Sequence, residues 1–335
     1  MDDLEARVRA ETAKADGKDP RFAELERLAT ELHGEGKDFR VEHGRIIQSP
    51  KDRDRDRETT IDLGGDHLRF GLVSDTHGGS KFEQNTALHR FYAYADGELG
   101  HPQTGERIAP VDGFIHAGDT TQGSDRMHLG MEHEVHAHGS DAQVSYVAAT
   151  YPRSGNGKKT WMISGNHDAS FLKDGGSNVV RQLAAAREDI VYLGQDAAYL
   201  NIGNLRAYVV HPDGGGAYAK SYKGQKFSES LPQEKDVRLL LLGHYHNYVS
   251  FMQRETAVFQ LPCFQSQYSW LARKGLHPDV AGIILDLWLD DKGGLRRLRH
   301  EVVRFPALED DWDHDVSSEV NRGWSSKGLA VSQSD

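Results

Sequence analysis

Five short apolar runs, each followed at once by a polar loop, constrain this chain more than any other feature. The runs are residues 67–74, 113–117, 160–164, 207–210 and 237–242. Each has the length of a strand, and each ends in a loop that contains His, Asp, Asn or Gly. Ligand sites in α/β folds lie just beyond the carboxyl ends of buried strands. The pattern therefore predicts an α/β fold with a polar site at the ends of its strands.

A charged run, KDRDRDRE at residues 51–58, contains no apolar residue. Alternating charge of this kind is typical of a solvated linker, so residues 51–65 are predicted to join two parts of the chain. Residues 1–50 are predicted to be a small appendage, helical up to residue 33 and followed by a hairpin. A helix followed by a hairpin resembles part of a winged-helix module. Because acids outnumber bases in residues 1–60, a structural or oligomerisation element fits at least as well.

The main domain is predicted to span residues 66–305, and the strand pattern continues through it to two final strands at 280–289 and 295–304. Residues 306–335 are acidic and rich in Ser, and we expect a loosely packed tail there. A chain of 335 residues with 37% hydrophobic content can bury one substantial core.

Charge and cysteine content exclude several classes of protein. The net charge of -11 argues against a protein that coats polyanions, because such binding depends on many Lys and Arg side chains. The single cysteine, Cys263, cannot form an internal disulfide, and we expect it to be a small buried side chain. The N-terminus lacks a signal-peptide pattern, and the apolar runs are too short to cross a bilayer. The expectation is a cytoplasmic protein with no membrane partner; the sequence leaves its oligomeric state open.

The loops after the five runs carry potential metal ligands. They read SDTH (Asp75, His77), AGD (Asp119), SGNHD (Asn166, His167, Asp168), VHPDGG (His211) and LGHYHN (His244, His246). Each motif alone is weak, since an Asp that caps a helix beside a solvated His is common. Together they place oxygen and imidazole donors after five strands, which favours a mixed-ligand transition-metal site.

In this order, the five blocks resemble the signature of the calcineurin-like metallophosphoesterase superfamily: DxH, GD, GNHD, a lone His and GHxH. The resemblance covers roughly residues 66–305 and implies a four-layer sandwich of two packed mixed β-sheets flanked by helices. It also implies two divalent metal ions that share Asp119. Asp75, His77 and His246 complete one metal site, and Asn166, His211 and His244 the other.

The same resemblance implies a hydrolase that cleaves a phosphoester by attack of a hydroxide bridging the two ions. Manganese is the metal expected by analogy, and iron, zinc or nickel also suit such ligands. His167 is expected to face the substrate and to assist catalysis together with Asp119. Asp168 is expected either to orient a ligand or to cap the following helix.

Other residues near these motifs have simpler interpretations. Gly118, Gly165 and Gly243 each precede a ligand, where a residue without Cβ permits a sharp turn. We expect His116 to pack at its strand end. His133, His136 and His138 are expected to lie in a solvated helix or loop, with contact to the substrate as the alternative, and His314 is expected to be exposed. The segment 261–268 is either a nucleotide-contacting surface or a plain connector.

The loop GDTTQGSDR departs from the GDxVDRG motif of protein Ser/Thr phosphatases and lacks its arginine. With GNHD in place of GNHE, the chain resembles the nuclease and phosphodiesterase side of the superfamily. The leading hypothesis is a phosphodiesterase that acts on nucleic acid, with DNA among the candidate substrates, or on nucleotides. The alternatives are a small-molecule phosphomonoesterase or cyclic-nucleotide phosphodiesterase, and a non-catalytic scaffold subunit.

Overall fold

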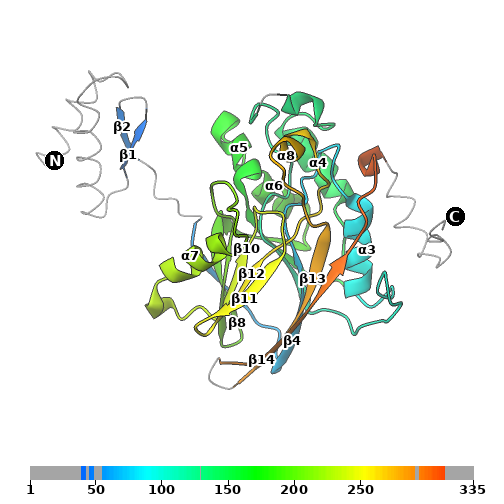
Figure 1. Ribbon diagram of the computed structural model, residues 1–335, viewed down its shortest axis with the longest axis vertical. Coiled ribbons are helices and arrows are strands. Elements are labelled where there is room, and N and C mark those ends of the chain that lie inside the picture. Colours follow the sequence, from blue (N-terminus) through cyan, green and yellow to red (C-terminus); the bar gives the residue numbers. More distant parts are fainter. Residues whose placement is uncertain (1–38, 43–44, 49–54, 129, 291–293, 314–335) are drawn as a thin grey trace, which may run out of the picture. The chain divides into compact units, whose positions relative to one another are not determined.

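The computed structural model describes residues 39–42, 45–48, 55–128, 130–290 and 294–313 (Figure 1). The chain divides into two compact units, Met1–Asp54 and Arg55–Asp335. In the first unit, β1 (Phe39–Glu42) pairs antiparallel with β2 (Arg45–Gln48), which confirms the predicted hairpin. The helical region predicted up to residue 33 lies outside the described residues.

Two six-stranded sheets form the second unit. One has the strand order β11-β12-β10-β9-β8-β3, and the other β14-β13-β4-β5-β6-β7. The strands of the first are β3 (Arg57–Ile61), β8 (Ala197–Ile202), β9 (Leu205–Val210), β10 (Leu239–Leu242), β11 (Val249–Gln253) and β12 (Thr256–Gln260). Those of the second are β4 (His67–Val73), β5 (Gly113–His116), β6 (Thr160–Ser164), β7 (Ile190–Gln195), β13 (Ala281–Leu289) and β14 (Leu295–Arg304). Both sheets contain parallel and antiparallel pairs, so both are mixed.

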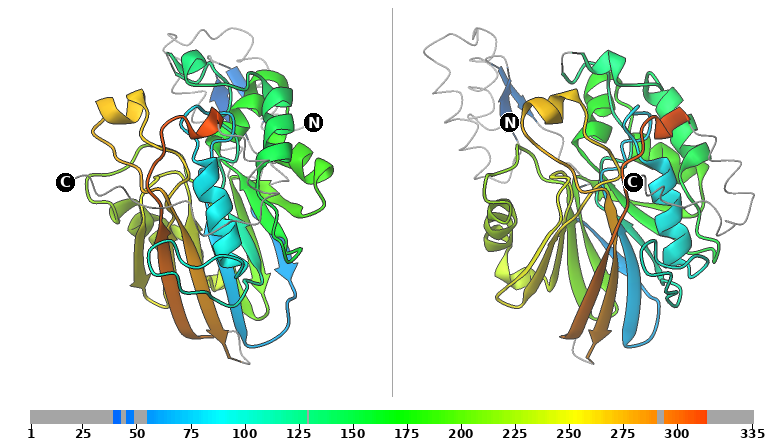
Figure 2. Two further views of the ribbon diagram at one scale, coloured as in Figure 1. Left: turned by 90° about the vertical axis from the view of Figure 1, so that its right-hand side faces the viewer. Right: turned by 45° about the vertical axis from the view of Figure 1, so that its right-hand side comes forward.

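Helices cover the outer faces of both sheets. The α-helices are α3 (Asn85–Ala95), α4 (Ser140–Thr150), α5 (Asn166–Gly175), α6 (Val179–Ala186), α7 (Tyr222–Ser230) and α8 (Ser269–Arg273). The described residues also form short 3-10 turns, namely η1 (Met131–His133), η2 (Gln233–Lys235) and η3 (Asp311–Asp313). Figure 2 shows α3 outside one sheet and α7 outside the other.

Alternation along the strands builds the layers, because successive side chains point to opposite faces of a sheet. Leu72 and Ile115 of one sheet and Val209 and Leu241 of the other are fully buried in a shared core between the sheets. The opposite face of the β4–β5–β6 sheet packs on α3, α4 and α6, and that of the β9–β10 sheet packs on α7. The predicted four-layer α/β sandwich is thereby confirmed.

The prediction of a linker over residues 51–65 is wrong for its middle part, where β3 forms an edge strand parallel to β8. Ile61 is buried and anchors the strand. Glu58 forms ion pairs with Arg206 and with Lys235, so part of the charge lies along a sheet edge. A single apolar residue in a charged run gave little sign of this strand.

The expectation of a loosely packed tail from residue 306 is also wrong for its first residues. The Asp311 carboxylate, 1% exposed, accepts a hydrogen bond of 2.8 Å from the backbone N–H of Thr86 at the start of α3. The backbone N–H of Leu308 donates to Gln84 at 2.7 Å. Residues 314–335, which include His314, lie outside the described residues. Among the helices that the structure describes, none is long and apolar enough to span a lipid bilayer.

Candidate metal centre

Topology brings the five loops that carry the predicted ligands to one end of the sandwich. Strands β4, β5 and β6 are parallel neighbours in one sheet, and β9 and β10 are parallel neighbours in the other. Parallel strands end at the same edge, so all five loops meet there. The loops are also joined directly: the backbone N–H of Asp75 donates to Gly118, that of His77 to Asp119, and that of His244 to the Asp75 carboxylate.

Left-handed backbone conformations gather in these loops. Five of the seven predicted ligands have a positive φ, namely Asp75 (52°), His77 (50°), Asp119 (55°), His244 (81°) and His246 (55°). Asp and His adopt this region more readily than most non-glycine residues, but it still costs about 1–3 kcal/mol each. Such strain persists where the surrounding structure imposes it, and it clusters at functional sites.

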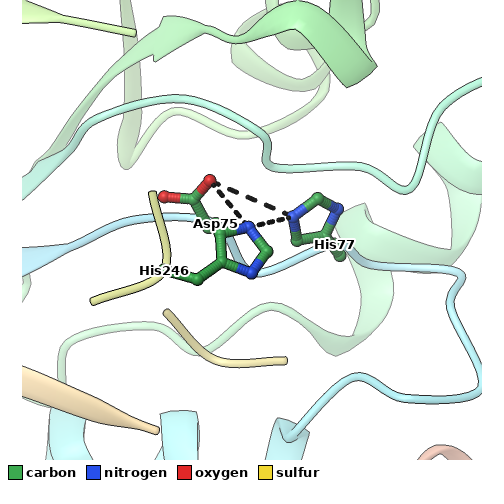
Figure 3. Close-up of side chains that lie close together, drawn as sticks. All are labelled: Asp75, His77 and His246. Carbon is green, nitrogen blue, oxygen red and sulfur yellow. Dashed lines mark hydrogen bonds and ion pairs between the residues drawn. The ribbon is translucent and has the colours of Figure 1, made fainter. Parts of the chain in front are cut away.

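Asp75, His77 and His246 form the first group of donors (Figure 3). His246 Nε2 lies 3.2 Å from Asp75 Oδ1 and 3.1 Å from His77 Nε2. The two imidazoles present nitrogens to each other, although only one of them can hold the hydrogen between them. Both Nδ1 atoms are buried without a hydrogen-bond partner. One potential donor atom from each of these three side chains lies within 4.8 Å of the other two.

Asp119, Asn166, His211 and His244 form the second group. His211 Nε2 lies 3.0 Å from Asp119 Oδ2 and 3.1 Å from Asn166 Oδ1, and His244 Nδ1 lies 2.8 Å from the same amide oxygen. The far nitrogens face carbonyl oxygens, which can only accept: His211 Nδ1 donates to Ala117 and His244 Nε2 to Gly214. These bonds leave His211 Nε2 and His244 Nδ1 free to bind a metal.

Asp119 lies between the two groups. Its Oδ2 is 3.0 Å from His211 Nε2 and 4.0 Å from His77 Nε2. Its Oδ1 accepts the backbone N–H of His167 at 2.8 Å, which fixes the carboxylate plane. A carboxylate in this position can reach both groups at once.

The buried carboxylates of the centre require positive charge close to them. Burial alone raises the pKa of Asp119, yet His211 and His167 hold it well below its usual range. In the same way, burial opposes ionisation of Asp75, but His246 and His211 lower its pKa. Burial lowers the pKa of His211, but Asp119 and Asp75 raise it to about 10. Protons thus balance two buried carboxylates, and metal ions would displace those protons.

His167 and Asp168 begin α5 and serve different purposes. The His167 Nδ1 donates to the carbonyl of Gln122 at 2.6 Å, and the ring lies edge-on to His77 with 4.6 Å between centroids. Asp168, 2% exposed, caps the helix through Gly165 N–H and also accepts from the N–H groups of Thr120 and Thr121. Burial and the neighbouring Asp119 raise its pKa to about 6. Of the two roles expected for Asp168, capping is the one its contacts show, and it also ties the loop after β5 to α5.

The three glycines that precede ligands have no room for a side chain. A Cβ on Gly118, whose φ is 90°, would lie 2.6 Å from His211 Nδ1. One on Gly243 would lie 2.6 Å from Ser74 Oγ, and one on Gly165 would lie 2.8 Å from Asp119 Cγ. The close approach of the loops therefore requires glycine at these positions.

Among the other histidines, the structure confirms that His116 is buried and that His133 and His138 are exposed. The expectation for His136 is wrong: its side chain is only 12% exposed, lies 3.3 Å from the Glu83 carboxylate and stacks on Trp312. Segment 261–268 is largely buried, as is Cys263, and Phe264 N–H donates to the Asp75 carbonyl. This segment is a connector that supports the site.

Sequence reasoning missed Arg126 and Lys173. Both line a hollow beside Asn166 and His244. Arg126 follows Asp119 by seven positions, in the loop that appeared to lack an anion-binding arginine. Lys173 lies two turns along α5 from Asn166. A basic residue at helical spacing from a predicted ligand was the available signal for Lys173.

Comparison with known proteins gave one family match. The model of the calcineurin-like phosphoesterase superfamily domain matches residues 68–262. A search of curated proteins found no match.

Solved structures similar to this chain include an archaeal phosphodiesterase (14% identity, 70% of this chain and 99% of that one, TM-score 0.36). They also include Vacuolar Protein Sorting 29 from Cryptosporidium parvum (13% identity, 72% of this chain and 99% of that one, TM-score 0.38). A third is a 5'-nucleotidase precursor from Thermus thermophilus (14% identity, 73% of this chain and 56% of that one, TM-score 0.35).

Proposed function

Since this chain belongs to the calcineurin-like phosphoesterase superfamily, we propose that it is a phosphodiesterase with two metal ions, acting on nucleic acid or nucleotides. Asp75, His77 and His246 hold one ion in this proposal, and Asn166, His211 and His244 hold the other. Asp119 bridges them. Mixed imidazole and carboxylate donors suit manganese, iron, zinc or nickel better than calcium or magnesium, and manganese is our choice by family analogy.

The spacing of the donor atoms is the observation that carries the proposal. Two ligand atoms that each lie about 2.1 Å from one ion, at right angles, are about 3.0 Å apart. The pairs His77–His246, His246–Asp75, His211–Asp119 and His244–Asn166 are separated by 2.8 to 3.2 Å. The facing Nε2 atoms of His77 and His246, 3.1 Å apart, also fit two ligands of one shared cation.

Divalent ions bound in this centre would supply charge that stabilises a phosphoryl transition state and would make water acidic enough to attack near neutral pH. The protein's own groups do the remaining work. The Asp119 carboxylate, fixed by the His167 N–H, sets the spacing of the two groups. Since His167 Nδ1 holds its hydrogen toward Gln122, Nε2 is the atom that can give a proton to the leaving oxygen. The diester of a nucleic acid needs such a proton because its leaving group, a sugar alkoxide, is a poor one.

The test uses protein loaded with Mn²⁺ and four substrates: bis-p-nitrophenyl phosphate, p-nitrophenyl phosphate, and labelled single- and double-stranded DNA. We expect turnover of the diester and of at least one DNA. Strong monoester turnover with inert diester and DNA would contradict the proposal and identify a phosphomonoesterase. Adding cyclic nucleotides to the panel separates a cyclic-nucleotide phosphodiesterase.

Metal analysis tests the non-catalytic alternative. We expect close to two transition-metal ions per chain in protein purified without chelator. Fewer than one ion per chain, with none taken up on addition, would favour a scaffold. The retention of all seven donors and of His167 supports the enzyme instead.

A further inference from the structure

A hollow of about 380 Å³ opens directly beside the proposed metal centre. Asn166 and His244 form the wall that it shares with the centre. Arg126, from the loop after β5, and Lys173, on α5, are the two cations that line it. A second hollow shares Arg126 and Met127 with the first and is also lined by His128 and by the acids Asp125 and Glu132.

Arg126 and Lys173 are available for a ligand. Both are exposed, and within the described part of the chain neither head group has a hydrogen bond or an ion pair. Two acids also line the hollow. The Asp174 carboxylate accepts a hydrogen bond from Ser124 Oγ at 2.5 Å, and Asp213 is exposed in the loop after β9. These two acids offset the local positive charge, so binding there needs an anion that contacts the two cations directly.

The charge of the centre accounts for only one phosphate group. Two divalent ions opposed by the carboxylates of Asp75 and Asp119 leave about two positive charges. The phosphodiester that is cleaved carries one negative charge and neutralises about half of this charge, and the rest lies at the metal centre rather than in the hollow. A second phosphate on the same substrate requires further cations nearby, and an arginine head group binds phosphate oxygens in pairs.

Building on the proposed phosphodiesterase function, we propose that Arg126 and Lys173 bind a second phosphate group of the substrate, next to the one that is cleaved. This phosphate is either the adjoining one of a nucleic-acid strand or a further one of a nucleoside polyphosphate. The two residues determine specificity; the cleaved bond lies at the metal centre.

Binding to Mn²⁺-loaded protein, measured by calorimetry, tests the proposal with three ligands. Thymidine 5'-monophosphate is the reference, thymidine 3',5'-bisphosphate represents a strand, and thymidine 5'-diphosphate represents a polyphosphate. We expect one of the latter two to bind at least about tenfold more tightly than the monophosphate. Arg126→Gln and Lys173→Gln should each remove about three- to tenfold of that preference and leave monophosphate binding unchanged.

Arg254→Gln is the matched control, because Arg254 is exposed in the turn between β11 and β12, at the opposite end of β12 from the centre. It should leave all three affinities unchanged. Equal affinity for the three ligands, or a preference that survives both substitutions, would overturn the proposal. Failure of the proposed phosphodiesterase function is detected separately. The wild type would then not turn over bis-p-nitrophenyl phosphate, a substrate that has no second phosphate.

Discussion

Replacing Gly165 by alanine is a direct steric test of the proposed bridge. Gly165 lies between β6 and α5, against the Asp119 side chain and backbone. Its φ of -108° and ψ of -171° are allowed for any residue, so alanine adds no backbone strain. The new Cβ would lie 2.8 Å from Asp119 Cγ and closer still to Asp119 Oδ1. The substitution therefore acts through contact with Asp119.

The size of the effect follows from that contact. Nonbonded carbon atoms pack about 3.5–4.0 Å apart, so Asp119 must move by roughly 1 Å. Overpacking of this kind costs about 1–3 kcal/mol of folding free energy. A displacement of about 1 Å in a catalytic group can lower turnover by about 10²-fold. Loss of the bridging position should also reduce the metal content below two ions per chain.

The measurements are metal content by mass spectrometry, turnover of bis-p-nitrophenyl phosphate and the free energy of unfolding in urea. Gly175→Ala is the control, because Gly175 lies at the other end of α5 from Gly165, has no positive φ, and an added Cβ meets nothing within 4 Å. It should be neutral or should stabilise by up to about 1 kcal/mol. Normal metal content and turnover in Gly165→Ala would refute the reasoning, as would equal losses in both variants.

Three further predictions concern the centre and its support. His167→Gln should lower kcat for labelled DNA, whose leaving oxygen needs a proton, by about 10²–10⁴-fold with unchanged metal content; loss of metal instead would make His167 a ligand. Chelation should abolish diester turnover, and Mn²⁺ should restore it in the wild type but not in Asp119→Asn, as activity after dialysis would reveal. Burial lowers the pKa of His116 from 6.5 to about 4. The neutral ring therefore contributes its full stability above pH 6.5, and this contribution declines as the pH falls toward 4. Urea unfolding should show a loss of about 2 kcal/mol between pH 7 and pH 5 that is absent in His116→Gln, and an equal slope in both proteins would contradict this.

The clustering of the potential donor side chains could be predicted from sequence because each follows a strand that is apolar enough to recognise. Asp75 and Asp119 come two or three positions after buried strands, and parallel pairing then forces their loops together. Local pattern and topology agree here, so short motifs were sufficient. The same reasoning predicted the bounds of β13 and β14 to within one residue.

Features that depend on distant partners were not predictable in this way. His136 is buried by Glu83 and Trp312, which come from unrelated parts of the chain. Strand β3 depends on pairing with β8, since its own sequence is charged and has one buried apolar residue. The hollow with Arg126 exists only because a loop and a helix end meet the centre. Such features depend on how distant parts of the chain pack together, and no periodic pattern in the sequence indicates them.

Because the backbone is left-handed at Asp75 and His77, the choice of substitution decides whether only the donor atom changes or the loop conformation changes as well. Asparagine adopts that conformation readily, whereas a β-branched residue does not. An asparagine at either position should preserve the path of the loop while changing the donor, and valine should disturb both. Inactive forms meant for trapping a bound substrate are therefore best made with asparagine.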